Sequence, residues 1–151
     1  MSPTLRVKDA YDIAKTSSLI VDENETLVSV IKSFVKKPEV RGIFLVDGER
    51  KLRGVVTRSD LLNIVKVRLG KDLGEIPLRI LVLKNLSDIK LREIVDMFSQ
   101  RAGVKLDESL EKALELMIEM DLVDIPVVDD DRKIIGDLAL SEILLKLMNS
   151  I

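Results

Sequence analysis

A chain of 151 residues, 46% hydrophobic and 33% charged, is long enough for one buried domain or for two small units that share a core. Its 24 basic and 26 acidic residues give a net charge of −2, with no contiguous basic tract and only 3% aromatic residues, so nucleic acid is not an expected partner. The sequence contains neither cysteine nor histidine, which excludes thiol nucleophiles, imidazole bases and Cys/His metal sites.

The first half of the chain predicts the order helix, strand, helix, strand, strand, helix. Acidic and capping side chains precede the second helix, Pro38 ends it, and Asp47-Gly48 is a turn signal between two strands. The predicted elements are a short leading helix over Arg6–Ala14, a strand at Leu19–Val21, a helix from Thr26 to Lys36, strands at Ile43–Val46 and Leu52–Val56, and a helix after Thr57 that ends near Gly70.

The second half repeats this order after a linker that is rich in glycine. It predicts a leading segment within Leu86–Phe98, a helix at Ser109–Met120, strands at Ile125–Val128 and Lys133–Gly136, and a helix at Leu140–Met148. The register of the leading segment stays open, because either Asp88 matches Asp9 or Leu91–Val95 matches Val7–Tyr11. The expected domains are residues 1–70 and 86–151, joined by a linker at 71–85.

An internal duplication explains this order. Gly54–Asp60 reads Gly-Val-Val-Thr-Arg-Ser-Asp and recurs 82 positions later (136 − 54) as Gly136–Glu142. A buried helical stripe recurs with a shift of 83, from Leu27, Val30, Ile31, Phe34 and Val35 to Leu110, Ala113, Leu114, Met117 and Ile118.

Neither copy can bury its apolar faces alone in about 60 residues. We therefore expect an α/β (α+β) fold with two βαββα units, each with a short leading helix and a three-stranded sheet. Pseudo-twofold symmetry should relate the units and leave two related clefts between them.

No segment is long and apolar enough to cross a bilayer, and Met1–Val7 lacks the pattern of a secretory signal. We therefore expect a cytoplasmic protein that does not contact a membrane. The absence of cysteine together with abundant lysine, arginine and glutamate is compatible with a thermophilic source.

The sequence resembles a tandem pair of cystathionine-β-synthase-type (CBS) domains, also called a Bateman module. The resemblance covers about Val7–Val65 and Leu86–Met148. It rests on three motifs: Val-x-x-Asn/Asp-Glu-Thr/Ser-Leu at Val21–Leu27 and Val104–Leu110, Val-Asp-Ile-Pro-Val-Val-Asp at Val123–Asp129, and the motif at Gly54–Asp60. It implies a stand-alone, non-catalytic regulatory module that requires no cofactor or metal and acts on an unknown partner in trans. AMP, ADP, ATP or S-adenosylmethionine would bind between its domains.

The resemblance also implies which residues bind the ligand. In the first cleft Asp60 and Thr57 would face the ribose, while the base would lie against Val123, Asp124 and Ile125, with Gly103 and Val104 nearby. In the second cleft Glu142 would face Arg41, Gly42 and Ile43. The second cleft is expected to bind its ligand more weakly, because Ala139 and Glu142 occupy the positions where the first copy has Thr57 and Asp60.

Other interpretations of these residues stay open. Thr57–Asp60 also fits a capping box, in which the carboxylate binds its own backbone. Arg58 and Arg41 could compensate for the missing basic residues by binding phosphate, but surface arginines are more often simply solvated. Because Asp124 would repel a polyphosphate, the sequence favours a nucleoside, a monophosphate or an S-adenosylmethionine-like ligand.

The alternative function is a structural dimerisation module with degenerate ligand sites. Members of this family commonly form flat homodimers through exposed helices. A candidate surface is the apolar side of the last helix together with its counterpart in the first copy; its residues are Ile143, Leu144, Leu145, Leu147 and Met148.

Overall fold

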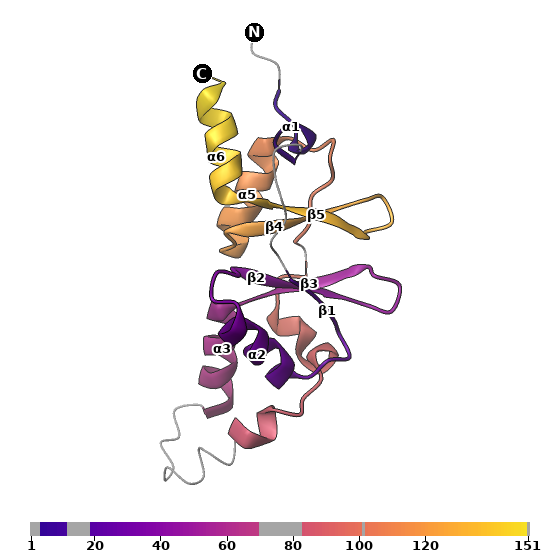
Figure 1. Ribbon diagram of the computed structural model, residues 1–151, viewed down its shortest axis with the longest axis vertical. Coiled ribbons are helices and arrows are strands. Elements are labelled where there is room, and N and C mark those ends of the chain that lie inside the picture. The colour runs from indigo at the N-terminus through magenta and orange to yellow at the C-terminus, as the bar shows by residue number, and fades with distance from the viewer. Residues whose placement is uncertain (1–3, 12–18, 70–82, 101, 151) are drawn as a thin grey trace.

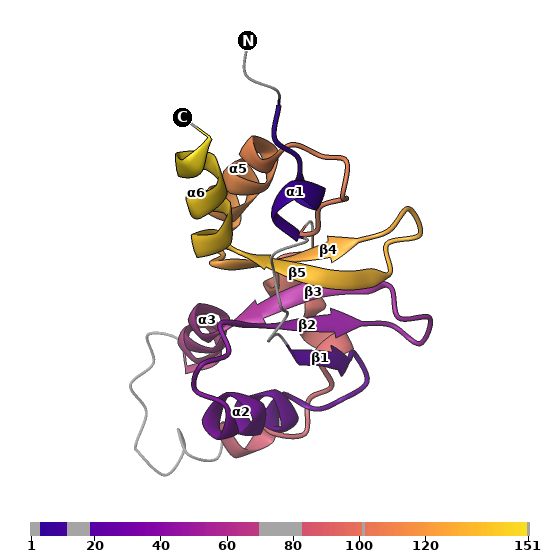
Figure 2. The ribbon, with the colours of Figure 1, turned by 45° about the horizontal axis from the view of Figure 1, so that its top comes forward.

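The computed structural model describes residues 4–11, 19–69, 83–100 and 102–150. Two α/β units lie one above the other along the long axis (Figure 1). Their sheets lie next to each other at the middle of the molecule, and the helices lie outside them, as the rotated view in Figure 2 also shows. The predicted fold class and duplication are confirmed.

The helices and strands closely follow the predicted order. The first unit contains β1 (Leu19–Asp22), α2 (Leu27–Lys36), β2 (Gly42–Val46), β3 (Leu52–Thr57) and α3 (Arg58–Leu69). The second contains α5 (Leu110–Met120), β4 (Asp124–Val128), β5 (Ile134–Ala139) and α6 (Leu140–Asn149), while the leading segments form α1 (Val7–Tyr11) and the 3-10 helix η1 (Leu91–Met97). The predicted leading helix extends to Ala14 and the predicted linker begins at residue 71, so parts of both lie outside the described residues.

The two sheets differ in one strand. In the first sheet β1 pairs in parallel with β2, which pairs antiparallel with β3. In the second sheet β4 and β5 pair antiparallel, and the expected third strand is reduced to a single bridge between Val104 and Val127. The bridge stays short because the chain turns directly after it, where the Leu106 carbonyl accepts the N–H of Lys8 (2.9 Å).

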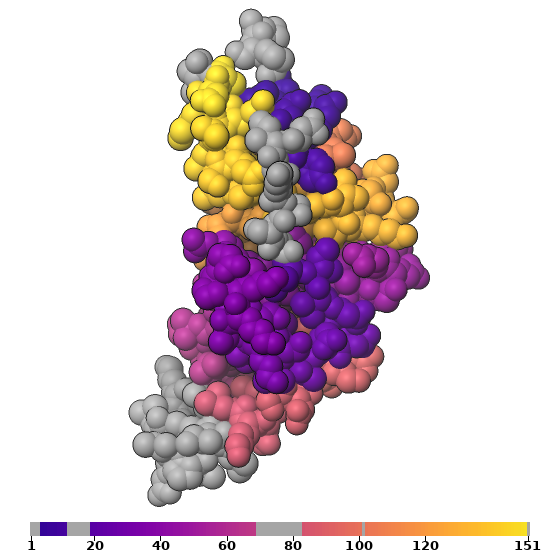
Figure 3. Space-filling model, in the orientation of Figure 1, coloured from indigo at the N-terminus to yellow at the C-terminus, as the bar shows by residue number. Residues whose placement is uncertain are grey.

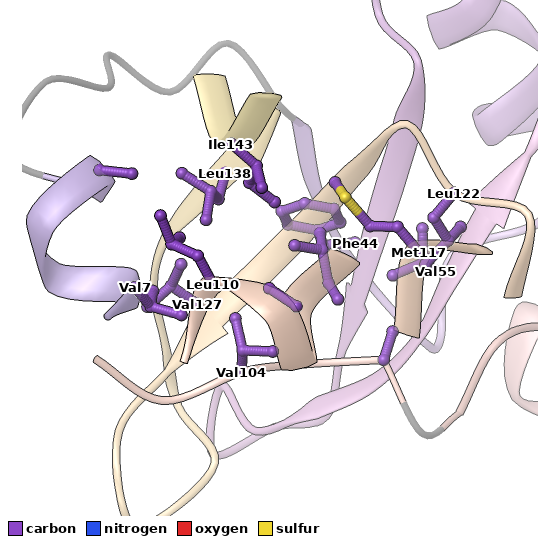
Figure 4. Close-up of a cluster of buried hydrophobic side chains, with 14 residues drawn as sticks. Val7, Phe44, Val55, Val104, Leu110, Met117, Leu122, Val127, Leu138 and Ile143 are labelled. Atoms are coloured by element: carbon purple, nitrogen blue, oxygen red, sulfur yellow. The ribbon is translucent and has the colours of Figure 1, made fainter. Parts of the chain in front are cut away.

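Each leading segment packs against the more distant unit. The helix α1 precedes the first unit and packs against the second, whereas η1 precedes the second unit and packs against the first. Val7 and Ala10 of α1 are buried in the core of the second unit, and Figure 4 shows Val7 in this cluster with Leu110 and Leu138. Leu91 and Ile94 of η1 are buried in the core of the first unit. The helix that the sequence groups with residues 1–70 therefore stabilises the second unit.

Backbone hydrogen bonds fix the register that the sequence left open. Val7 N–H donates to the Glu108 carbonyl (2.8 Å), and Leu91 N–H donates to the Glu25 carbonyl (2.9 Å). Two further pairs of equivalent bonds repeat this correspondence. The N–H of Lys8 donates to the Leu106 carbonyl as that of Arg92 does to the Glu23 carbonyl. The N–H of Leu110 donates to the Leu5 carbonyl as that of Leu27 does to the Ile89 carbonyl. Leu91–Val95 therefore matches Val7–Tyr11, with an offset of 84 (91 − 7).

The units are joined by apolar packing between their sheets. Phe44 of β2 and Val55 of β3 are 1% and 0% exposed and belong to the core cluster of the second unit (Figure 4). The space-filling view shows the two units stacked as one continuous body (Figure 3). A ligand held between them would therefore contact two units that share a core.

Candidate ligand cleft between the two units

A hollow of about 220 Å³ opens where the two units meet. In the first unit, the antiparallel register places Gly42 at the start of β2 beside Thr57 at the end of β3. In the second unit, the chain between α5 and β4 forms the opposite wall. The lining residues are Arg41, Gly42, Thr57, Arg58, Ser59, Asp121, Leu122, Val123 and Asp124.

The second-unit wall depends on how α5 ends. Asp121 caps the helix in a left-handed conformation (φ 57°, ψ 47°), which aspartate and asparagine adopt more readily than most residues. Its N–H donates to the carbonyls of Ile118 and Met117, and the chain then turns into β4. This turn places the carboxyl-bearing residues Asp121 and Asp124 in the wall of the hollow, and Asp124 is 8% exposed.

Asp60 forms the reciprocal capping box at the start of α3. Its Oδ2 accepts the N–H of Thr57 (2.8 Å), and Thr57 Oγ1 accepts the N–H of Asp60 (3.2 Å). Burial raises the pKa of Asp60, the bonds from Thr57 act in the opposite direction, and the charge of Asp121 raises it further. Asp60, the residue predicted to face the ribose, does not itself line the hollow, although Thr57 and Ser59 beside it do.

Arg58 lines the hollow but uses its guanidinium elsewhere. Its Nη1 donates to the carbonyl of Val40 (2.8 Å), and its Nη2 donates to those of Pro38 (3.0 Å) and Phe34 (3.4 Å). The group also lies over the Phe34 ring, 4.9 Å from its centroid. Simple solvation does not describe this side chain, because it binds the carbonyls at the end of α2 and in the loop that follows.

Comparison with known proteins fits this arrangement of two similar units around a cleft. The profile of the CBS domain matches residues 8–67 and 91–149. The chain belongs to the CBS domain family. The part of the chain that the structure describes contains no helix that could cross a membrane.

Solved structures of CBS proteins have the same fold. A CBS domain-containing protein of Thermotoga maritima is 25% identical with a TM-score of 0.72, over 97% of this chain and 96% of that one. CBSX2 in complex with AMP is 23% identical with a TM-score of 0.65, over 96% and 97%. The CBS domain pair of MJ0100, in complex with 5′-methylthioadenosine and S-adenosyl-L-methionine, is 19% identical with a TM-score of 0.64, over 99% and 100%.

The second CBS unit repeats only part of the Asp60 arrangement. Glu142 Oε1 accepts the N–H of Ala139 (3.1 Å), but Ala139 has no side-chain oxygen to accept a bond in return. Burial raises the pKa of Glu142, and the charge of Asp137 raises it further. Glu142 lines a separate hollow of about 150 Å³ with Ala10, Leu145, Lys146 and Asn149, between α1 and α6.

The structure therefore groups the predicted ligand residues differently from the sequence. Arg41 and Gly42, which the resemblance assigns to the second cleft, line the same hollow as Thr57, Arg58, Val123 and Asp124. Val104, Ile125 and Ile43 are 0% exposed within the two cores. A Cβ on Gly103 would lie 3.0 Å from the Leu52 side chain, away from the residues that line this hollow.

Three lining residues were not predicted: Ser59, Asp121 and Leu122. Ser59 lies within the recognised motif, so its neighbours could have indicated it. Asp121 and Leu122 follow the last apolar position of a predicted helix, where a sequence pattern gives the end of the element but not what it faces.

Residues at the end of α5 also line a second hollow, of about 390 Å³. Met120, which lines it, directly precedes Asp121 of the first hollow. The other lining residues are Asp96, Phe98, Ser99, Gln100 and Glu119. The C-terminal end of α5 thus borders both hollows.

Proposed function

We propose that this CBS pair is a regulatory rather than a catalytic module, and that it binds a small adenosyl ligand between its two units. The supporting observation is the hollow that both units line, with Thr57 in its lining and Asp60 hydrogen-bonded to Thr57. A ligand that contacts both units shifts their arrangement if it binds one arrangement more tightly. The AMP in CBSX2 and the adenosyl ligands in the MJ0100 pair support this ligand class.

The chemistry of the Asp60 carboxylate suits a ribose. The capping bond uses Oδ2, and a carboxylate has a second oxygen that can accept from a ligand hydroxyl. Each such hydrogen bond to a charged group contributes about 1.5–3 kcal/mol. Thr57 and Ser59 line the hollow, and their hydroxyls add further hydrogen-bonding groups.

The size of the hollow suggests how binding changes the protein. A volume of about 220 Å³ lies below the roughly 300–1,000 Å³ of most ligand pockets. We therefore expect a whole adenosyl ligand to favour a slightly wider separation of the two units. Such a differential preference is the property that a sensor needs.

Titration calorimetry tests this proposal with AMP, ADP, ATP, S-adenosylmethionine and 5′-methylthioadenosine. Asp60→Ala should weaken the tightest ligand at least about tenfold, the effect of one lost charged hydrogen bond. Glu142→Ala is the matched control, since it also removes a helix-start carboxylate bond but lies at a different hollow. The proposal fails if none of these ligands binds, or if Asp60→Ala binds as tightly as the folded wild type.

A structural module with unused clefts is the second candidate function. It is favoured by the way that Arg58, Asp60 and Glu142 all bind the protein's own backbone. Protein purified from its natural host distinguishes the two functions. A bound adenosyl compound, identified by mass spectrometry after denaturation, supports the sensor, and its absence together with negative calorimetry supports the structural module.

We also propose a homodimer formed through the exposed apolar side chains of the outer helices. Ile118, Leu145 and Met148 of α5 and α6 are 73%, 60% and 63% exposed, and Val35 and Leu62 of α2 and α3 are 74% and 56% exposed. Ile143, predicted to be part of this surface, is instead buried in the core. Sedimentation velocity should show a dimer that Leu145→Glu converts to a folded monomer, and a wild-type monomer would refute the proposal.

A further inference from the structure

We propose that the cleft selects adenosyl ligands whose 5′ substituent is cationic or uncharged over those that carry a polyphosphate. The inference rests on the proposed function, because it names the ligand class of the same cleft. It is argued from the charges around the hollow and from how its arginines are used.

Two carboxyl-bearing residues of the second unit line the hollow. They are Asp121 and Asp124, whereas Asp60 of the first unit is not part of the lining. Asp121 is exposed, so its carboxylate is accessible to a ligand in the hollow. Like charges repel more strongly beside a packed interface than in bulk water, so each additional phosphate on a ligand is disfavoured.

The N–H groups of the two lining arginines are not arranged to bind a chain of phosphates. A guanidinium binds phosphate best through its two parallel N–H groups. Arg58 directs both Nη atoms at carbonyls of the loop after α2, those of Val40 and Pro38. Arg41 is the other guanidinium in the lining, and among the described residues it has no ion-pair partner. One available guanidinium matches a single phosphate and not a chain of them.

The neighbouring hollow has the same sign of charge. Its described lining residues include Asp96 and Glu119 and contain no lysine or arginine. A ligand group that reached this second hollow would therefore meet carboxylates again. The sulfonium and ammonium groups of S-adenosylmethionine are attracted by such a surface, the uncharged thioether of 5′-methylthioadenosine is tolerated, and a triphosphate is repelled.

The test compares ligand ratios in three proteins. S-adenosylmethionine, 5′-methylthioadenosine and magnesium-free ATP are titrated into the wild type, Asp121→Asn and Asp88→Asn. Asparagine removes one charge at position 121 and still adopts the left-handed conformation found there. Asp88 is exposed and lines neither hollow, so Asp88→Asn controls for the loss of one negative charge.

We expect wild type to bind S-adenosylmethionine at least about tenfold more tightly than ATP, and Asp121→Asn to narrow that ratio at least about threefold. Asp88→Asn should leave the ratio within about twofold of the wild-type value. Equal or tighter binding of ATP by the wild type, or an unchanged ratio in Asp121→Asn, overturns the selectivity while the proposed function stands. Binding of none of the ligands overturns the proposed function itself.

Discussion

The two copies of the motif, Gly54–Asp60 and Gly136–Glu142, show which features the fold needs and which belong to one cleft. In both copies a carboxylate accepts the backbone N–H three residues before it. In the first copy alone Thr57 returns the bond, and the motif borders a hollow lined by both units. The helix-start bond is therefore a structural requirement of each unit, whereas the hydroxyl and the shared hollow are specific to the first.

The residue that follows Thr57 in the first copy and Ala139 in the second also differs between the copies. Arg58 binds three carbonyls at the end of α2 and in the loop after it, and the equivalent Leu140 has no polar group. Arg58 thus links the start of α3 to the loop that leads to Arg41 and Gly42, which line the hollow. The first unit therefore has hydrogen bonds from the start of α3 to the loop beside the hollow, and Leu140 cannot form them in the second unit.

The largest stability difference should come from the two motif glycines. A Cβ on Gly136 would lie 2.3 Å from the Tyr11 ring, whose hydroxyl donates to the Ile135 carbonyl (2.6 Å). A Cβ on Gly54 would lie 3.3 Å from the Cβ of Phe98. We expect Gly136→Ala to cost about 1–3 kcal/mol of unfolding free energy and Gly54→Ala less than about 1 kcal/mol, measured by urea denaturation. Equal costs would contradict the packing of α1 on the second unit.

Replacing Arg58 by leucine makes the first copy resemble the second at that position. Arg58→Leu removes the charged donors from three carbonyls and should cost about 1–2 kcal/mol, the lower part of the range because the side chain is exposed. Thermal unfolding monitored by circular dichroism measures the loss. Leu140→Arg is the reciprocal control, and a similar gain there would show that the carbonyl contacts are not specific to the first unit.

Exchange of the hydroxyl between the copies should have a smaller effect. Thr57→Ala removes one capping bond and is expected to cost about 1 kcal/mol, while Ala139→Thr should recover up to about that amount. Chemical denaturation of both single variants and the double variant gives the comparison. If Ala139→Thr destabilises the protein, the second helix start cannot hold the hydroxyl that the first one uses.

The smallest expected effect is the pH dependence of the two carboxyl groups. Burial raises the pKa of both Asp60 and Glu142, so the native state binds these protons more readily than the unfolded chain. The contribution of each group to stability is present at low pH and is lost as the pH rises through its raised pKa. Asp60→Asn and Glu142→Gln should each remove part of this loss, measured as the unfolding free energy from acidic to neutral pH.

A titration followed by carbon NMR separates the two groups further. Ligand hydroxyls that donate to Asp60 stabilise its charged form, so saturating ligand should lower its pKa and leave that of Glu142 unchanged. Equal shifts of both groups, or none, would contradict a ligand contact that is specific to the first copy.

Local sequence patterns predicted the helices and strands well because each depends on spacing within a few residues. The stripe from Leu110 to Ile118 and the turn at Asp47-Gly48 are examples, and both lie where the pattern places them. Partners across the chain could not be predicted in this way. The apolar spacing of Val7 and Ala10 shows that one face of α1 is buried, but not that it is buried in the second unit.

The candidate site was predicted only in part, because motifs locate neighbours along the chain but not partners across it. The motif located Thr57 and its neighbours, and the resemblance placed Val123 and Asp124 opposite them. The lining of the hollow contains Thr57, Val123 and Asp124 together. The bonds from Arg58 span 18 to 24 residues, and no short motif carries that information. The ligand assignments, the domain boundaries and the cytoplasmic location stay predictions.

A crystal structure of the protein with its tightest adenosyl ligand tests the central claim most directly. The account predicts one ligand between the two units, with a ribose hydroxyl within hydrogen-bonding distance of an Asp60 oxygen and the ligand in contact with the stretch from Asp121 to Asp124. A ligand bound beside Glu142 alone, or outside the space between the units, would contradict it.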